Sequence, residues 1–486
     1  MTLPDRTPDE LLARLKQLEK AVRPLEPGST KRRRIRQAAV ARSELFLRGV
    51  TGLRAFEPSD NAAELARAPI REAGRPLDEV LELLDRAVFR PGSNPVTGAH
   101  LAYIPGGGLY HSAIGDYLAA VTNKYAGIAF TGPGPVRMEH MLVRWTADLV
   151  GYPADAGGHL ASGGSIATLA ALATARDVHG LKGADVARAV VYLTTQAHHC
   201  IEKALRIAGL GEVVVRHVAM DERYRMRPEA LAAAIAADRT AGLRPWCVIA
   251  AAGTTDTGAV DPLEAIADVA TREGCWYHVD AAYGGYFMLT EHGRGLLRGI
   301  ERSDSAVLDP HKGLFIPFGV GVVLVRDVGA LAATHRYMGH YMQDAEQDQH
   351  EVSPAEISPE LTKHFRALRM WLPLQLLGTA PFAAALEEKL LLARYARRGL
   401  MALGFEVGPE PDLSIVTFRW APPGLSLEET NQLNQGIVER IRKDGRVFLS
   451  STMLDGRFTI RLAVLNFRTH RRSVDLALRV LAELVV

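Results

Sequence analysis

Lys312 and Asp280 have the residue types and the order needed for one kind of covalent chemistry. Lys312 lies in the run Asp304-Ser-Ala-Val-Leu-Asp-Pro-His-Lys-Gly313, and Asp280 lies upstream, in the run Trp276-Tyr-His-Val-Asp280. A lysine can form a Schiff base with an aldehyde cofactor, and an aspartate can keep a pyridine nitrogen protonated. The pair therefore predicts pyridoxal 5'-phosphate as the cofactor. The alternatives are that Asp280 caps the next helix and that Lys312 is a solvated surface residue.

The surroundings of both residues favour the chemical interpretation. Asp280 follows an apolar run that reads as a buried strand, which would place it at the carboxyl end of a sheet, where ligands bind in open α/β proteins. Lys312 is followed by the apolar run 314–318, an environment that disfavours a free ammonium and favours an imine.

A cofactor phosphate needs backbone N–H groups and a hydroxyl at the start of a helix. Gly164 and Ser165 end a glycine-rich turn, and the Ala- and Leu-rich residues 166–172 that follow are strong helix formers. We expect Gly164 and Ser165 to hold the phosphate, although glycine-rich turns before helices are also common without a ligand.

The ring of the cofactor needs contacts on its faces. His198 follows a predicted strand and could stack on one face, with Ala282 against the other. Thr254 is a further candidate for a cofactor contact, and the alternative is that Thr254 and Thr255 only form a turn. His198 could equally be an ordinary loop histidine. No metal site is predicted, because His198 and the adjacent His199 cannot easily converge on one ion.

Composition limits the partners and the compartment. The chain has 486 residues, 48% of them hydrophobic, and a net charge of +2, so no overall field favours nucleic acid or a membrane surface. A small-molecule partner fits better. We expect a cytoplasmic protein without structural disulfides, since only Cys200, Cys247 and Cys275 are present and no export signal or apolar span is visible. The basic run 31–36 reads as a solvated helix face or a subunit contact rather than a nucleic-acid site.

The pattern along the chain predicts three parts. Residues 1–108 read as a helical N-terminal arm, residues 109–375 as a large cofactor-binding domain, and residues 376–486 as a small α+β domain. In the large domain, β-branched runs alternate with helical stretches, which predicts a largely parallel sheet covered by helices. The predicted strands are residues 189–193, 246–250, 275–279 and 319–325 there, and 414–420, 446–450 and 458–464 in the small domain, where a long helix covers 381–398.

Taken in order, these residues resemble the group II pyridoxal-phosphate-dependent amino acid decarboxylases, which include aromatic-L-amino-acid decarboxylase. The similarity covers about residues 99–468. Its motifs are Ser162-Gly-Gly-Ser165, Gln196-Ala-His198, Gly253-Thr-Thr255, His278-Val-Asp-Ala-Ala282, Asp304-Ser305 with His311-Lys312, Pro359-Glu-Leu361 with Phe365-Arg366, and Arg461-Leu-Ala-Val464. Each motif alone is unspecific, whereas the ordered set is specific.

The resemblance implies the aminotransferase-like fold type I, with a mainly parallel seven-stranded sheet, and a homodimer with its active site at the subunit interface. It also implies that Lys312 carries the cofactor, Asp280 pairs with the pyridine nitrogen and His198 stacks on the ring. Gly164 and Ser165 would bind the phosphate, and the motif residues Ser305 and His311 would join the cofactor site.

Three positions depart from the family pattern. Ala251 stands where relatives often carry a threonine, and glycines occupy 106–108 where some carry a hydroxyl residue. The loop 343–358 lacks the tyrosine that returns a proton to the carbanion in aromatic decarboxylases, which leaves His350 in the loop and Tyr341 just before it as candidate donors.

The predicted reaction is decarboxylation of an L-amino acid, with an aromatic one as the expected substrate, to an amine and CO2. One alternative keeps the cofactor but yields an aldehyde by oxidative decarboxylation, or follows another lyase or transfer reaction. A second is a dimeric relative without turnover, which intact Lys312 and Asp280 argue against. Arg468 is expected either to meet an anionic group of substrate or cofactor or to form a salt bridge between domains.

Overall fold

The computed structural model describes residues 7–337 and 351–485 of the chain. Contacts between Cα atoms divide it into two compact units, Met1–Leu53 with Ser59–Pro91, and Arg54–Pro58 with Gly92–Val486. The first unit thus ends before the predicted arm boundary at residue 108, and the second contains both predicted domains. The boundaries at 108 and 375 stay predictions. No helix in the described parts of the chain has the length and apolar character to span a membrane.

The first unit is helical, as the sequence predicts. Its main helices are α1 (Pro8–Val22), α2 (Ser29–Gly49) and α3 (Leu77–Leu84), which continues as a π-helical turn over Asp85–Phe89. Thr7 and Glu10 form a capping box at the start of α1, and Arg42 pairs with Asp85. The basic run 31–36 lies on α2 with exposed side chains.

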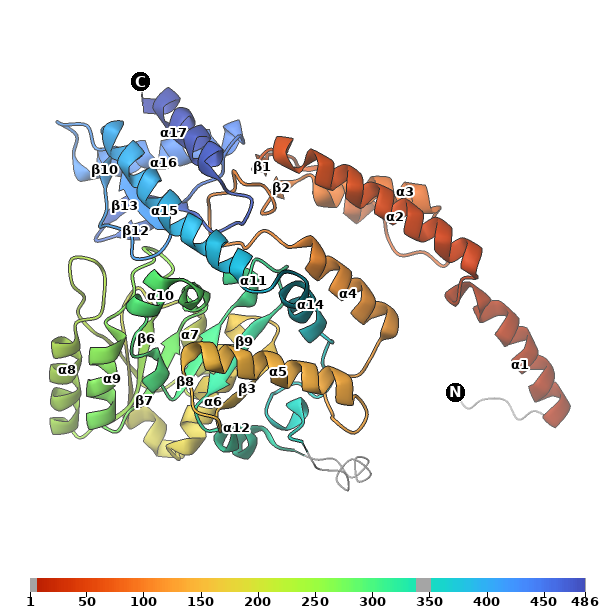
Figure 1. Ribbon diagram of the computed structural model, residues 1–486, viewed down its shortest axis with the longest axis horizontal. Coiled ribbons are helices and arrows are strands. Elements are labelled where there is room, and N and C mark those ends of the chain that lie inside the picture. Colours follow the sequence, from red (N-terminus) through yellow and green to blue (C-terminus); the bar gives the residue numbers. More distant parts are fainter. Residues whose placement is uncertain (1–6, 338–350, 486) are drawn as a thin grey trace. The chain divides into compact units, whose positions relative to one another are not determined.

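The second unit is built around a seven-stranded, mostly parallel sheet (Figure 1). Strand β9 runs antiparallel to its neighbours β8 and β3, and the remaining neighbours pair in parallel. This arrangement confirms the predicted fold type I architecture. The strands, in spatial order, are β3 (Gly157–Ala161), β9 (Gly321–Val325), β8 (Ser305–Leu308), β7 (Trp276–Asp280), β6 (Arg244–Ala251), β4 (Ala189–Leu193) and β5 (Val214–His217).

Helices cover both faces of this sheet, because alternate residues of each buried strand point to opposite sides. Val190 and Tyr192 of β4 pack on one face with helices α5, α8 and α9, while Val191 and Leu193 pack on the other with α6 and α7. The helices are α5 (Pro133–Val150), α8 (Pro228–Thr240), α9 (Leu263–Arg272), α6 (Gly164–Val178) and α7 (Cys200–Ile207).

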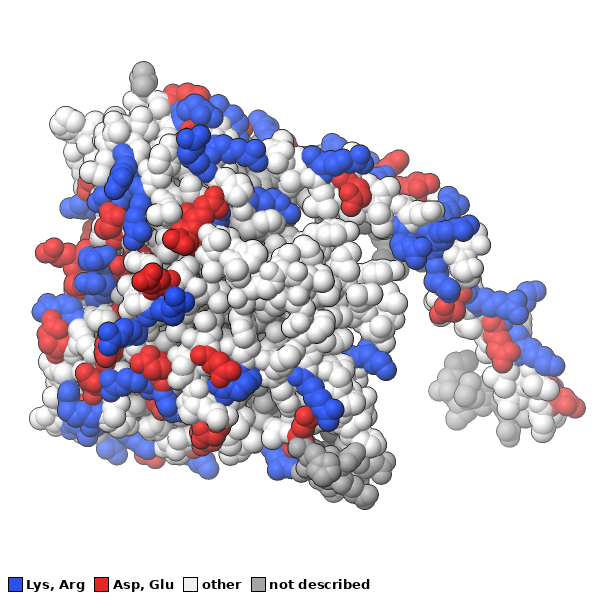
Figure 2. All heavy atoms as spheres, viewed as in Figure 1, with Lys and Arg blue, Asp and Glu red and all other residues white. Residues whose placement is uncertain are grey.

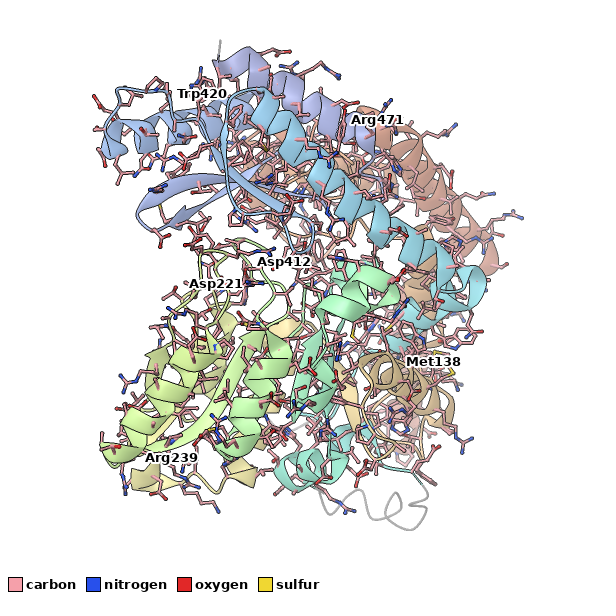
Figure 3. All side chains as sticks on the ribbon, turned by 60° about the vertical axis from the view of Figure 1, so that its left-hand side comes forward. Met138, Asp221, Arg239, Asp412, Trp420 and Arg471 are labelled. Atoms are coloured by element: carbon pink, nitrogen blue, oxygen red, sulfur yellow. The ribbon has the colours of Figure 1, made fainter. Side chains whose placement is uncertain are left out.

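The C-terminal part is an α+β structure with its own core. Its four-stranded antiparallel sheet has the order β10 (Glu406–Val407), β11 (Ile415–Arg419), β13 (Arg457–Ala463) and β12 (Ser450–Leu454). Helices α15 (Ala380–Ala402), α16 (Leu427–Asp444) and α17 (Arg471–Val485) pack against it. Figure 3 shows Trp420 in this part and Arg239 in the part that contains the large sheet.

One predicted strand is wrong. Residues 446–449 lie outside the strands of the small sheet, and β12 begins only at Ser450. Gly445 ends α16 in a left-handed conformation (φ 72°), and Phe448 then pairs with the distant segment around His100 instead of joining the small sheet. The apolar character of Val447 to Leu449 reflects burial in this crossing segment.

The two sheets are tied together by side chains from loops. Arg223 donates to Asp412 Oδ1 (2.5 Å), and the backbone N–H of Val260 donates to Asp412 Oδ2 (3.0 Å). Figure 3 shows Asp412 facing the loop that holds Asp221. A buried bond from Tyr283 to Ser414 adds a further link (2.6 Å). The loops at the carboxyl end of the large sheet are therefore held against the C-terminal part.

Candidate active site

A cavity of about 330 Å³ opens at the carboxyl ends of the parallel strands. Strand β7 ends in Asp280, and β8 is followed by Asp309 and the short helix α11 (Pro310–Gly313). These loops bring together predicted residues that are far apart in the sequence, because parallel strands all end at the same edge. The lining comprises Ile104, Ser162, Gly163, Gly164, Ser165, Ile166, Thr168, His198, Cys200, Gly253, Thr255, Asp280, Ala282, Tyr283, Asp309, His311 and Lys312.

The glycine-rich turn leads directly into α6, as predicted. Gly163 is the N-cap, with φ 158°, and Gly164 is the first helical residue. A Cβ added at Gly164 would lie 2.9 Å from Asp309 Oδ2, so a larger residue here would require the Asp309 carboxylate to shift. The first N–H groups of a helix have no partners within it, and here the residues that carry them line the cavity. The turn can therefore hold an anion such as a phosphate.

Asp280 is the last residue of β7 and lines the same cavity. Its Oδ1 accepts a hydrogen bond from the backbone N–H of Ala282 at 3.1 Å, which fixes the carboxylate at the strand end. No α-helix begins directly after Asp280, since the next element is the 3-10 turn Gly285–Leu289. The alternative role as a helix cap is therefore not what the structure shows.

His198 lies in the loop before α7, with its ring fixed by the backbone. Its Nδ1 accepts from the N–H of Cys200 at 3.2 Å, which leaves Nε2 to carry the proton of the neutral ring. Burial lowers the pKa of His198, while the charge of Asp280 acts in the opposite direction. A neutral imidazole is well suited to lie against an aromatic cofactor ring.

Lys312 occupies the middle of α11 and donates to Asp309 Oδ2 at 2.9 Å. Burial alone would lower its pKa, but the nearby carboxylates of Asp309 and Asp280 offset this effect, and the pKa of Lys312 is raised. The expectation that its surroundings disfavour an ammonium is therefore corrected. The apolar run that follows it supplies the predicted burial, while the carboxylate three residues earlier supplies the counterion.

His311 lines the cavity beside Lys312 and is held by a backbone carbonyl. Its Nδ1 donates to the oxygen of Val320 at 2.6 Å, which orients the ring, and its centroid lies 5.7 Å from that of Phe318. Nε2 is thus the ring atom left for other contacts.

Thr254 and Ser305 do not line the cavity. The hydroxyl of Thr254 bonds to that of Thr257 at 2.8 Å and accepts from the N–H of Ala259, so Thr254 stabilises its turn, and Thr255 faces the cavity instead. Ser305 is buried in β8 and accepts from Trp276 Nε1 at 2.9 Å. It also bonds to Nδ1 of His278 at 2.8 Å.

Several lining residues were missed by the sequence analysis. Asp309, Cys200 and Tyr283 line the cavity. Asp309 lies inside the run 304–313 that contains Lys312, Cys200 lies two residues after His198, and Tyr283 follows Ala282. Their position after strand ends was the available signal. The described residues contain no group of three His, Cys, Asp or Glu side chains that could hold a metal ion.

A second cavity of about 360 Å³ adjoins the first. Both cavities are lined by Lys312, His198, His311, Thr255 and Ile104, so the lysine borders both. The second also has an aromatic lining. Its other residues are Ser93, Pro95, His100, Tyr103, Pro105, Phe318 and Arg461.

Arg461 is the cationic residue of the second cavity besides Lys312, and its guanidinium is used within the protein. Nε donates to the carbonyl of Asp256 at 2.7 Å, Nη1 to Ser450 Oγ at 2.9 Å, and Nη2 to the carbonyl of Thr255. Burial lowers the pKa of Arg461. These bonds hold the 253–258 loop in place.

Arg468 has a different role from either one expected. Its Nη1 donates to the backbone carbonyls of Gly107 (2.8 Å) and Val96 (3.3 Å), and its guanidinium lies 4.3 Å from the ring centroid of Phe467. Arg468 therefore fastens the glycine segment 106–108. The candidate proton donors Tyr341 and His350 lie outside the described residues.

The residues present fit pyridoxal phosphate. The glycine turn at α6 matches a phosphate, Asp280 matches a pyridine nitrogen, His198 and Ala282 match the two faces of a ring, and Lys312 matches an aldehyde. A cavity of about 330 Å³ is within the usual range for a small-molecule site.

Comparison with known proteins agrees with this chemistry. Residues 85–421 match the family described as the pyridoxal-dependent decarboxylase conserved domain. The aromatic-L-amino-acid decarboxylase of Bacillus atrophaeus is 37% identical over 403 residues, 82% of this chain and 84% of the relative. The phenylacetaldehyde synthase of Arabidopsis thaliana is 28% identical over 420 residues, 84% of this chain and 86% of the relative.

The fold also matches a solved structure, Oryza sativa TDC with PLP and tryptamine. The TM-score is 0.89 at 25% identity, covering 94% of this chain and 98% of that one. The family match spans more than half of the chain, and it coincides with the cavity in which Lys312, Asp280 and the glycine turn meet. The chain therefore belongs to the pyridoxal-dependent decarboxylase family and is a pyridoxal-phosphate-dependent amino acid decarboxylase.

Proposed function

We propose that this enzyme decarboxylates an aromatic L-amino acid and releases the amine and CO2. The observation that carries the proposal is the second cavity, which shares Lys312 with the cofactor cavity and is lined by Tyr103, Phe318 and His100. An aromatic side chain gains from offset or edge-on contacts with such rings. The cavity therefore suits a flat apolar group attached to an α-carbon near Lys312.

The charge of this cavity argues against an acidic substrate side chain. A carboxylate there would need a cation with free donors. Among the described lining residues, Arg461 already donates to Asp256, Thr255 and Ser450, and Lys312 serves the cofactor. An acidic side chain would thus lose its hydration without gaining an ion pair.

Tyr103 has a strained backbone beside this cavity. Its φ is 54°, in the left-handed region that residues with a side chain rarely adopt. The ring lies 6.0 Å from that of Phe448 and 6.4 Å from that of His100, measured between centroids. Strain of this kind is often retained where it positions a functional side chain, which supports a role for Tyr103 in holding the substrate ring.

Each cofactor-site residue then has a defined task. Bound pyridoxal phosphate supplies an electron sink for the carbanion that remains when the α-carboxylate leaves as CO2. Asp280 holds the proton at the pyridine nitrogen, His198 and Ala282 enclose the ring, and Gly164 and Ser165 bind the phosphate. Lys312 would hold the cofactor through its aldehyde. His311, fixed by the bond from its Nδ1 to the Val320 carbonyl, borders both cavities. Its Nε2 accepts a hydrogen bond in the neutral ring and donates one only when the ring is protonated.

A second outcome is favoured by a specific comparison. The phenylacetaldehyde synthase of Arabidopsis thaliana is among the relatives, and the sequence 343–358 of this chain contains no tyrosine. In simple decarboxylation, a proton replaces the carboxylate at the α-carbon. In the oxidative route, O2 and water are consumed, and aldehyde, CO2, ammonia and hydrogen peroxide are formed. The identity of the proton donor decides between these products.

The test is incubation of the purified enzyme with L-tyrosine, L-tryptophan, L-phenylalanine, L-glutamate and L-2,4-diaminobutyrate. We expect CO2 and amine in equal amounts from an aromatic substrate. Turnover restricted to L-glutamate or L-2,4-diaminobutyrate would contradict the proposal of an aromatic substrate. Release of ammonia and hydrogen peroxide in equal amounts would show that the product is the aldehyde and not the amine.

Variants of the aromatic lining test the pocket itself. Tyr103→Ala and Phe318→Ala should raise KM for the aromatic substrate by about 10-fold, since each removes an aromatic contact worth about 1 kcal/mol beyond its burial. Phe130→Ala, an exposed phenylalanine outside both linings, is the matched control. An unchanged KM in both pocket variants would place the substrate ring elsewhere.

We further propose that the enzyme is a homodimer. Helix α4 (Tyr110–Thr122) carries a stripe of exposed apolar side chains, namely Tyr110, Ile114, Tyr117, Leu118 and Val121. Figure 2 shows few charged side chains over this part of the surface. A patch of this kind is typical of a protein interface. Sedimentation should give twice the chain mass for the wild type, and Tyr117→Asp with Val121→Asp should shift it toward the monomer.

We also propose a cytoplasmic location. Cys200, Cys247 and Cys275 are buried free thiols, as expected in a reducing compartment. Fractionation of the producing cells, with activity measured in each fraction, tests this proposal.

A further inference from the structure

Asp309 is a buried carboxylate at the cofactor site to which the sequence analysis gave no role. It follows β8 and is 2% exposed. Its Oδ2 lies 2.9 Å from Lys312 Nζ, while Oδ1 has no hydrogen-bond partner within residues 7–337 and 351–485. A buried acceptor without a partner is costly unless a ligand or a proton completes it.

The same carboxyl group lies against the glycine turn where the phosphate belongs. A Cβ at Gly164 would be 2.9 Å from Oδ2, and a Cβ at Gly321 would be 2.8 Å from Oδ1. Gly164 is the first residue of α6, whose N-terminus is the anion-binding end. Asp309 and a phosphate held at this turn are therefore close neighbours.

Among the residues that the structure describes, the groups around Asp309 include one strong counterion, Lys312. Nε2 of His311 lies 3.7 Å from Oδ2, too far for a hydrogen bond, and His198 is kept neutral by its burial, which lowers its pKa. Of the other facing groups, Asp280 is itself acidic, and burial raises the pKa of both Cys200 and Tyr286, so neither thiol nor phenol ionises readily.

Cofactor binding changes this balance. In the free protein the ammonium of Lys312 neutralises Asp309. When the cofactor binds, Nζ of Lys312 is used by the aldehyde of the cofactor. The cofactor phosphate, with a charge of about −1.5 to −2 at neutral pH, lies at the glycine turn that contains Gly164. Two anionic groups in contact at a buried site cannot both stay fully ionised, so one of them takes up a proton.

We propose that Asp309 is protonated in the cofactor-bound enzyme and donates a hydrogen bond to the phosphate. One proton passes from solvent to the Asp309 carboxylate, forming an O–H bond, and no electrons are transferred. Asp309 is thus a positioning residue that exchanges an ion pair with Lys312 for a hydrogen bond to the cofactor. Cofactor affinity is then linked to pH, whatever the amino acid substrate.

The experiment compares pyridoxal phosphate with pyridoxal, which lacks the phosphate but reacts with Lys312 in the same way. Each is titrated into the full-length, cofactor-free protein at pH 8, where free phosphate monoesters are doubly ionised. Calorimetry in buffers of different ionisation enthalpy gives the protons taken up. For the wild type, we expect pyridoxal phosphate to take up about one proton more than pyridoxal.

The affinity for pyridoxal phosphate, relative to pyridoxal, should accordingly fall about tenfold per unit rise in pH above 8. Asp309→Asn, whose amide donates without needing a proton, should abolish both differences. Asp304→Asn, a partly buried aspartate just before β8, is the control and should behave as the wild type. Equal proton counts for the two ligands in the wild type, or an unchanged difference in Asp309→Asn, would overturn the proposal.

A measurement on the wild type alone covers the case in which Asp309→Asn does not fold. Adding pyridoxal phosphate should produce the infrared carbonyl band of a protonated carboxylic acid, shifted in D2O, whereas pyridoxal should not. If both ligands produce the band, or neither does, the proton is not shared between Asp309 and the phosphate, and the inference fails.

Discussion

Nε of Arg461 donates to the backbone carbonyl of Asp256 at 2.7 Å, joining β13 of the C-terminal sheet to a loop of the large sheet. The same guanidinium also bonds to the carbonyl of Thr255, which lines both cavities. Its ligands are neutral carbonyls and a hydroxyl, so the cation acts here as a clamp on the backbone. Through it, the C-terminal part of the chain shapes both cavities.

Arg461→Gln should therefore weaken both folding and cofactor binding. Hydrogen bonds to a charged group are worth about 1.5 to 3 kcal/mol each, and part of that is recovered by water or the new amide, so we expect the free energy of unfolding to fall by about 2 to 4 kcal/mol. Urea unfolding and a cofactor titration measure the two effects. Arg457→Gln, on the same strand but 56% exposed, should change stability by less than about 1 kcal/mol. Equal effects of the two variants would contradict the clamp.

The sequence alone predicted the main sheet well because buried parallel strands appear as short apolar runs. Residues 189–193 match β4 at both ends, and Asp280 does end β7. The cavity also contains most of the predicted residues, since strand ends in a parallel sheet lie at one edge. The strand expected over 446–450 failed because the pairing of Phe448 with the His100 segment is a long-range contact with no local signal.

Errors within the site arose from geometry at the scale of one residue. Thr254 and Thr255 are adjacent, and the turn determines which of them faces the cavity. The hydroxyl of Thr254 bonds within the turn to that of Thr257, and Thr255 faces the cavity. Similarly, Asp309 reaches Lys312 only because α11 makes one helical turn between them. Neither arrangement can be read from residue types, since both require the local backbone path.

Lys312→Ala should abolish decarboxylation and the visible absorbance of the bound cofactor. The side chain lines both cavities, and an alanine has no amine to bond the aldehyde. Turnover and absorbance spectra of the purified protein test this directly. Lys203→Ala, on the exposed face of the nearby helix α7, is the control and should retain both properties. Persistent turnover in Lys312→Ala would contradict the assigned site.

Protonation of buried His278 should lower the free energy of unfolding at acidic pH. His278 is fully buried in β7, and burial lowers its pKa to about 4, against the weaker effect of Asp280. The unfolded chain, with an ordinary histidine pKa near 6.5, binds the proton first. Stability from neutral His278 is thus present above about pH 6.5 and is lost as the pH falls toward 4, by about 3 kcal/mol in total.

Urea unfolding between pH 7 and pH 4 measures this loss. His278→Gln should flatten the dependence on pH in that window, because the amide does not titrate and can still bond to Ser305. His217→Gln, an exposed histidine at the end of β5, serves as the control and should leave the slope unchanged. A wild-type slope in His278→Gln would assign the acid sensitivity to other buried groups.

Lys363 and Glu139 form an ion pair that is buried on both sides. Nζ lies 2.6 Å from Oε1, the side chains are 0% and 1% exposed, and the same oxygen accepts from the N–H of Leu160. Lys363→Met would leave a buried carboxylate uncompensated, so we expect a loss of about 3 to 5 kcal/mol in the free energy of unfolding. Adding Glu139→Gln should recover part of it, which a double-mutant cycle measures.

An ion pair at the surface, formed by a residue on the same helix as Glu139, provides the comparison for Lys363→Met. Arg137 of α5 pairs with Glu351 at 3.1 Å but is 70% exposed, so Arg137→Gln should cost less than about 1 kcal/mol. If Lys363→Met and Arg137→Gln have similar effects, or if the cycle shows no coupling, the buried pair does not stabilise this edge of the large sheet.

The proton donor for the carbanion is predicted to be His350 or, failing that, Tyr341. General acids contribute about 10² to 10⁴-fold to a rate, so His350→Asn should slow amine formation by at least about 100-fold and raise the share of aldehyde and peroxide. Tyr341→Phe is tested beside it, and Tyr337→Phe, which alters an exposed tyrosine just before these residues, is the control. Product ratios and rates are measured for each variant with the preferred substrate. Wild-type amine formation in both His350→Asn and Tyr341→Phe would exclude both donors, and His311, which borders both cavities beside Lys312, would then be the next candidate.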